Sequence, residues 1–167
     1  MENSPLTAAE LQTLYGQPRE LVAEAWAAGL EATTRAFIAA SPFLLLSSIN
    51  SEGFIDMSPR GGSPGFINVI DDHKIEFLDQ LGNRKIHTFR NLSDNNKVGL
   101  CFMIPGVKEV LRAYGVAKVV NDLATIERLG GVPERNRVAV KITLHKVFPY
   151  CSNALNLAGL WSPETVE

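Results

Sequence analysis

Two adjacent cations, Arg84 and Lys85, stand where a predicted strand gives way to a predicted helix. A helix N-terminus presents free backbone N–H groups and the positive end of the helix dipole, and so attracts phosphate. Gly82 permits a close approach of the backbone, and Asn83 can cap the helix. Because cations at this end oppose the dipole, an anionic ligand would reverse an unfavourable interaction. The segment predicts a phosphate site, and the alternative is a solvated basic helix surface.

A second cation follows the strand predicted over residues 54–58. Arg60 lies two residues after Ser58 and opens the glycine- and proline-rich loop 61–65. A guanidinium can hold a phosphate by two parallel hydrogen bonds. The loop is not a P-loop, because no Gly-Lys-Ser/Thr follows, and no GxGxxG fingerprint occurs. Taken alone, such a loop is more often a plain connection between strands.

The sequence offers no metal-ligand cluster and no clear general acid or base. His73, His87 and His145 are too widely spaced to form a metal site, and no HExxH motif occurs. We therefore name no catalytic residue and no metal ligand.

The remaining reactive or charged residues have structural interpretations. Asp71-Asp72 is typical of a turn, and the charges at 127–128 and 134–137 are expected to form a solvated face. Cys101 and Cys151 are expected to be buried free thiols.

Composition narrows the function classes. The chain has 167 residues, 46% of them hydrophobic, and a net charge of −2. These values favour one globular domain and exclude a disordered chain. A pI of 5.9 argues against a nucleic-acid partner. No apolar run is long enough to span a membrane, and no signal peptide is expected at the start, so we expect a cytoplasmic protein.

Helices precede strands along the chain. We expect a helical segment over 1–41 that packs on the barrel, its second helix running roughly from 19 to 40, and a single barrel domain over 42–167. A helix from about Asn83 to Asn95 is inserted among the strands. Six or so antiparallel strands in meander order predict a mainly β fold, a β-barrel with flanking helices. The strands are expected over 43–49, 54–58, 66–70, 75–79, 98–104, 110–120 and 137–148.

Three segments together resemble the pyridoxamine 5′-phosphate oxidase-like FMN-binding split-barrel flavoproteins. Members commonly show Gly-Ser/Asn-Arg-Lys, then a helix, then Asn-x-x-Val-x-Leu-x-Phe, as this chain does over 82–102. The stretches 57–61 and 104–115 are similar to one subgroup. The resemblance covers about 43–120 well and the tail to Trp161 weakly.

The resemblance implies FMN as the cofactor. Arg84 and Lys85 would grip its phosphate, with Gly82 and Asn83 supplying polar and backbone contacts. It also implies a homodimer, whose flavin sites lie at the subunit interface and are completed by the second chain.

The strand ends would contribute the other FMN contacts. By the same resemblance, Ser58 and Arg60 face the phosphate and the flavin edge, while Leu78 and Asp79 line the isoalloxazine or the ribityl chain.

The tail differs from that of the vitamin B6 oxidases. Their Arg-Leu-x-Pro pattern is reduced to Leu160–Pro163 without the arginine, and Cys151–Leu155 lacks the lysine of the subgroup. We therefore do not expect vitamin B6 oxidation. The expected function is a flavin-dependent oxidoreductase acting on an unidentified small molecule. The alternatives are a non-catalytic flavin-binding or storage module, and a split barrel that uses a deazaflavin or haem.

Overall fold

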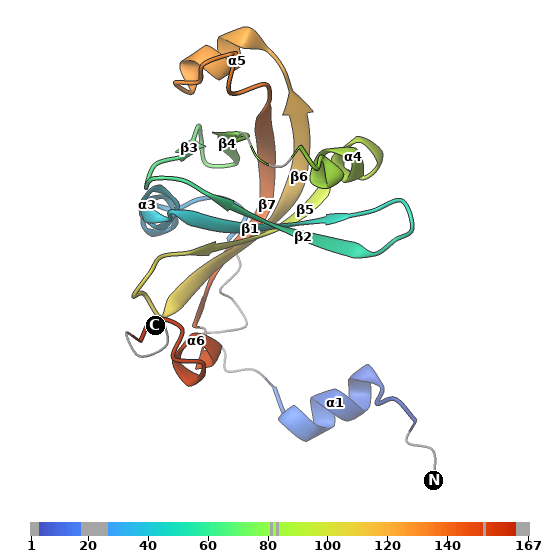
Figure 1. Cartoon of the computed structure of the whole chain (residues 1–167). Helices are drawn as coiled ribbons and strands as arrows, with labels where there is room; N and C mark the ends of the chain where they lie inside the picture. The colour runs from blue at the N-terminus through green and yellow to red at the C-terminus, as the bar shows by residue number, and fades with distance from the viewer. Residues whose placement is uncertain (1–3, 18–26, 81, 83, 152, 163–167) are drawn as a thin grey trace.

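One antiparallel sheet of seven strands forms the body of the molecule in the computed structural model (Figure 1). The structure describes residues 4–17, 27–80, 82, 84–151 and 153–162. The strands run in the order β2-β1-β5-β6-β7-β4-β3. Their bounds are β1 Phe43–Ile49, β2 Ile55–Gly61, β3 Ile67–Val69, β4 Lys74–Leu78, β5 Lys97–Met103, β6 Glu109–Val120 and β7 Ala139–Cys151.

In the described part of the chain, five short helices accompany the sheet. They are α1 Ala8–Tyr15, α3 Ala32–Ala40, α4 His87–Asp94, α5 Leu123–Arg128 and α6 Asn153–Leu157. None of the helices in the described part of the chain is long and apolar enough to cross a membrane. The mainly β, antiparallel architecture predicted from the sequence is confirmed.

The strand order departs from the predicted meander. β1 pairs with β5 and β4 pairs with β7, so the hairpins β1–β2 and β3–β4 attach to opposite sides of β5–β6–β7. The sequence between β4 and β5, which contains α4, carries the chain from one side to the other. As a result, β2 and the end of β4, which are distant in the sheet order, both lie at the loop before α4.

Alternating burial along the strands builds the core. In β1 every second side chain is buried, and in the pairing with β5, Leu44 lies opposite Phe102 and Leu46 opposite Leu100. Ile38 of α3 is fully buried with them. This two-residue period fixes which face of each strand meets the core and which faces outward.

The second predicted helix is too long at its start. Within the described residues, Ala27 instead forms an isolated bridge with Val147 of β7, and the Leu30 N–H donates to the Asp72 carbonyl at 2.7 Å. Residues 19–26 lie outside the described part. These backbone groups bind β7 and the turn before β4, so they are not free for helical hydrogen bonds. The helix α3 therefore begins only at Ala32.

The N-terminal helix α1 has a capping box but no buried residue. The Thr7 hydroxyl accepts from the Glu10 N–H at 3.3 Å, and the Glu10 carboxylate accepts from the Thr7 N–H at 2.8 Å. Docking of the segment 1–41 on the barrel remains a prediction.

Arg128 is exposed, as predicted, and it also binds a buried carboxylate. Glu76 of β4 is 7% exposed, and it forms ion pairs with Arg128 of α5 and, at 3.8 Å, with Lys141 of β7. The Lys141 ammonium also donates to the Thr125 hydroxyl at 2.7 Å. These contacts fasten α5 to the sheet and so fix where the loop between α5 and β7 starts.

The cysteines are more accessible than predicted. Cys151 is exposed at the end of β7, so its interpretation as a buried thiol is wrong. Cys101 is half-buried, and this burial raises the pKa of its thiol, while the positive charge of Arg112 acts in the opposite direction.

Gly115 should be intolerant of a side chain. It lies at the irregularity where the pairing of β6 with β7 shifts register, and a Cβ there would come within 2.2 Å of the Thr143 carbonyl oxygen. Because that neighbour is backbone, we expect Gly115→Ala to lower the free energy of unfolding by about 2–3 kcal/mol, measured by urea denaturation. Gly61→Ala is the control, since a Cβ on Gly61 would lie 3.4 Å from its nearest neighbour, the Pro42 carbonyl oxygen. Equal stability of the two variants would contradict the predicted steric clash at Gly115.

Candidate functional site

A cavity of about 710 Å³ opens where β2, the end of β4 and the loop before α4 meet. Its volume lies within the range of about 300–1,000 Å³ that is usual for small-molecule sites. It brings together most of the residues singled out in the sequence. The described lining residues are Ser58, Pro59, Arg60, Asp79, Gln80, Gly82, Arg84, Lys85, Ile86, Phe89, Arg135, Arg137 and Val138.

Positive charge dominates this lining, which we call the cation cavity. Five of its described lining residues are arginine or lysine. Among all the described lining residues, Asp79 alone carries a carboxylate. Net positive charge in a concave site attracts anions and raises their local concentration. The cavity is therefore suited to an anionic ligand.

Arg60 is held in place by two neighbours. Its Nη1 donates to the Asp79 Oδ1 at 2.8 Å, and its Cζ lies 5.4 Å from the centroid of the Phe89 ring. The buried Nε of the same guanidinium has no hydrogen-bond partner among the described atoms. Buried donors in native proteins are nearly always satisfied, so this Nε is a candidate donor to a ligand. A phosphate oxygen is an acceptor of the right kind.

Asp79 is fixed through its backbone. Its N–H donates to the Val138 carbonyl at 3.0 Å, and its carbonyl accepts from the Asn136 amide at 3.1 Å. Burial raises the pKa of the Asp79 carboxyl, and the nearby positive charge of Arg60 partly offsets this effect. The side chain is thus a poorly hydrated carboxylate that depends on Arg60 as a partner.

The helix expected from Asn83 begins later. Arg84 has a φ of 61°, in the left-handed region, so it interrupts a right-handed helix, and α4 starts only at His87. Arg84 and Lys85 therefore lie on the loop before the helix and not in its first turn. Asn83 lies outside the described residues.

A buried hydrogen bond positions α4 beside the cavity. The Asn91 amide of α4 donates to the Ser48 hydroxyl of β1 at 2.9 Å, and both residues are buried. This contact holds α4 against the β1–β2 hairpin and so places Phe89 below Arg60.

Arg135 and Arg137 are functional candidates that the sequence did not indicate. They were expected on a solvated face, and although exposed they line the cation cavity. Asn136 between them is bound to Asp79 through its amide nitrogen, while its Oδ1 accepts from the Val132 N–H at 3.1 Å. Only the pairing of β7 with β4 brings this loop to the site, and no local motif signals that pairing.

Leu78 is not brought into the cation cavity. It lines a neighbouring cavity of about 480 Å³, together with side chains of the 65–68 and 129–136 segments. Gln80 and Arg135 line both cavities, which therefore adjoin. The described residues contain no group of three or more His, Cys, Asp or Glu side chains placed to hold a metal ion.

The family of the chain follows from a profile comparison. The pyridoxamine 5′-phosphate oxidase profile matches residues 30–151, well over half of the chain. The chain belongs to the pyridoxamine 5′-phosphate oxidase family. No curated protein matches the chain significantly.

Several solved structures share the fold at low identity. HupZ of Group A Streptococcus has a TM-score of 0.59 at 15% identity, over 74% of this chain and 95% of HupZ. A putative pyridoxamine 5′-phosphate oxidase of Lactobacillus delbrueckii has a TM-score of 0.58 at 18% identity, over 73% of this chain and 95% of that protein. A putative 5-nitroimidazole antibiotic resistance protein of Bacteroides thetaiotaomicron has a TM-score of 0.50 at 16% identity, over 72% of this chain and 87% of that protein. These similarities establish the split-barrel fold.

The backbone at Arg84 offers a separate test of conformation and charge. A non-glycine residue at a φ of 61° is strained, and glycine is not. We expect Arg84→Gly to be more stable than Arg84→Ala by about 1 kcal/mol in denaturant unfolding. Both variants lose the same cation and should bind inorganic phosphate equally weakly. Equal stabilities would show that this loop conformation is not strained.

Proposed function

We propose that this member of the pyridoxamine 5′-phosphate oxidase family binds FMN and acts as a flavin-dependent oxidoreductase on a small molecule. The observation that supports this most is the cation cavity, which is lined by five cations, one of them the Arg60 guanidinium with its unpartnered buried Nε. An ionic phosphate supplies the acceptor and the negative charge that this arrangement lacks.

The residues of the cavity can divide the work of holding FMN. Arg60, Arg84 and Lys85 would bind the phosphate, with the Ser58 hydroxyl and the backbone at Gly82 as further polar contacts. Bound FMN supplies hydride-transfer chemistry, and the protein contributes binding, orientation and electrostatics. The cations of the 135–137 loop face the same space and add to the attraction.

The adjoining cavity gives a second small molecule a place beside the cofactor. Its lining carries the amide groups of Asn68, Gln80 and Asn136 together with Arg135, and no carboxylate among the described lining residues. Such a lining favours a polar, neutral or anionic substrate. We do not propose vitamin B6 oxidation, because the stretch Leu160–Pro163 lacks the arginine of the Arg-Leu-x-Pro pattern of vitamin B6 oxidases.

We further propose that the chain forms a homodimer through the outer face of β2, β1, β5 and β6. On the edge strand β2, the outward side chains of Ile55 and Met57 are 73% and 61% exposed. Exposed apolar edge strands are rare in monomers because they promote association. Membership of this family makes a second copy of the chain the natural partner for this face.

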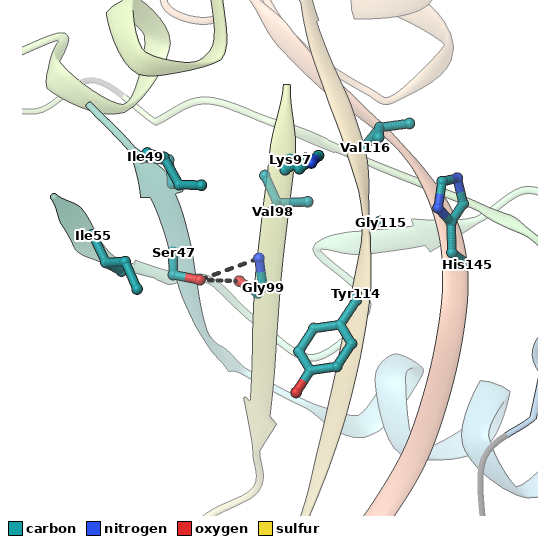
Figure 2. A pocket seen from close by; sticks show the side chains of 11 residues that line it. Ser47, Ile49, Ile55, Lys97, Val98, Gly99, Tyr114, Gly115, Val116 and His145 are labelled. Atoms are coloured by element: carbon teal, nitrogen blue, oxygen red, sulfur yellow. Dashed lines mark hydrogen bonds between the residues drawn. The ribbon is translucent and has the colours of Figure 1, made fainter. Parts of the chain in front are cut away.

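The same face is hollowed next to β2. The cavity has a volume of about 400 Å³. Strands β1, β2, β5, β6 and β7 all contribute residues to its lining (Figure 2). Gly99 lines this cavity, where the Ser47 hydroxyl accepts from the Gly99 N–H at 3.1 Å and donates to the Gly99 carbonyl at 3.2 Å. A face that is both apolar and indented can receive side chains of a second copy.

Arg84→Ala should weaken FMN binding. Loss of one charge-assisted contact is expected to cost about 1.5–3 kcal/mol, roughly ten- to a hundred-fold in Kd, measured by quenching of flavin fluorescence. Arg90→Ala is the matched control, since Arg90 is exposed on α4 and lines a different cavity. Unchanged affinity of Arg84→Ala, or equal losses in both variants, would refute the phosphate site.

Turnover separates an oxidoreductase from a storage module. Anaerobic reduction of the bound flavin by NADH or NADPH, followed by reoxidation with small-molecule acceptors, is the expected behaviour. Failure with every donor would favour the non-catalytic alternative.

Met57→Glu should dissociate the dimer. A carboxylate on the outer face would have to be buried unpaired in the interface, so sedimentation velocity should show a shift from dimer to monomer. Leu123→Glu on α5, where Leu123 is 59% exposed, is the control and should stay dimeric. A monomeric wild type, or a dimeric Met57→Glu, would overturn this interface.

A further inference from the structure

Asp79 occupies the place that an anionic ligand needs. It is the one carboxylate among the described residues of the cation cavity, and its Oδ1 accepts from the Arg60 Nη1 at 2.8 Å. The two side chains are only 24% and 21% exposed, so water screens them weakly. A phosphate that binds Arg60 must therefore approach this carboxylate closely.

The pairing leaves Arg60 incompletely satisfied. Asp79 receives one hydrogen bond from one terminal nitrogen, while the buried Nε has no partner. A guanidinium has five N–H donors in a fork, and a phosphate offers several acceptor oxygens to that fork. A phosphate can thus satisfy more of Arg60 than Asp79 does, which favours exchange of one anion for the other.

The exchange would leave a carboxylate beside a dianion. In a poorly hydrated site the carboxylate and the phosphate repel each other, which raises the free energy of the complex. Protonation of the carboxyl removes this repulsion. Burial already raises the pKa of Asp79, and Arg60 is the charge that opposes this effect. The charged groups facing Asp79 in the cavity are Arg60 from β2, Arg84 and Lys85 from the loop before α4, and Arg135 and Arg137 from the loop before β7, while α4 contributes the uncharged Phe89.

We propose that Asp79 is the resident counter-ion of Arg60, that a phosphate bound at Arg60 replaces it, and that the displaced carboxylate takes up one proton from solvent. An O–H bond forms on Asp79, and no other reactant is needed. The identity of the phosphate as that of FMN rests on the proposed function, whereas the exchange itself concerns any oxyanion at Arg60. Because binding takes up a proton, affinity is expected to fall as the pH rises through the titration of Asp79.

A titration with sulfate tests the exchange without FMN. Sulfate stays dianionic over the whole range, so NMR of the Asp79 side-chain carboxyl in the full chain reports only the protein group. We expect the Asp79 midpoint to rise by about one pH unit in sodium sulfate relative to sodium chloride of equal ionic strength. Arg60→Gln should abolish the effect on Asp79. An Asp79 midpoint that is equal in the two salts overturns the proposal.

Proton counting with FMN separates this proposal from the proposed function. Calorimetric titration in two buffers of different ionisation enthalpy should show that wild type takes up more protons per bound FMN than Asp79→Asn, by up to one. Asp79→Asn should also gain affinity relative to wild type as the pH rises. Equal proton counts would refute the exchange. If FMN fails to bind while sulfate still shifts Asp79, the FMN assignment fails and the counter-ion exchange stands.

Discussion

The contact between Arg60 and Asp79 joins parts of the sheet that share no backbone hydrogen bonds. Arg60 lies on β2 at one edge of the strand order, and Asp79 follows β4 near the other. Their contact requires the sheet to bend until these two regions meet, and the cation cavity forms where they do. Phe89 on α4 and the loop before β7 are placed around this same contact. A change in strand pairing would therefore disperse the site.

Hydrogen bonds and ion pairs of buried or half-buried side chains hold the elements around the cation cavity in place. Asn91 binds Ser48 and holds α4, while Asn136 binds both Asp79 and the loop that carries two arginines. On the other side of β4, Glu76 fixes α5 by ion pairs. These groups are buried or half-buried, where an unmet hydrogen bond is costly, so they specify one arrangement of loops around the cavity.

Local patterns in the sequence were sufficient to predict the strands and the cationic segments, because two-residue periodicity and turn residues act over a few positions. They could not predict which strands pair, so the predicted meander was wrong and Arg135 and Arg137 were missed. The start of α4 was misplaced since nothing in the sequence shows that Arg84 adopts a positive φ. Ser58, Arg60, Asp79, Gly82, Arg84 and Lys85 were proposed from motifs and a resemblance, and the fold brings them to one cavity. Leu78 lies beside it, in the adjoining cavity.

We propose that the cation cavity holds the phosphate of a flavin. The most direct measurement is mass spectrometry of the small molecules released from protein purified without added cofactor. We expect FMN, in an amount close to one per chain. Release of haem, or a protein that contains no flavin and stays colourless after incubation with FMN, would contradict it.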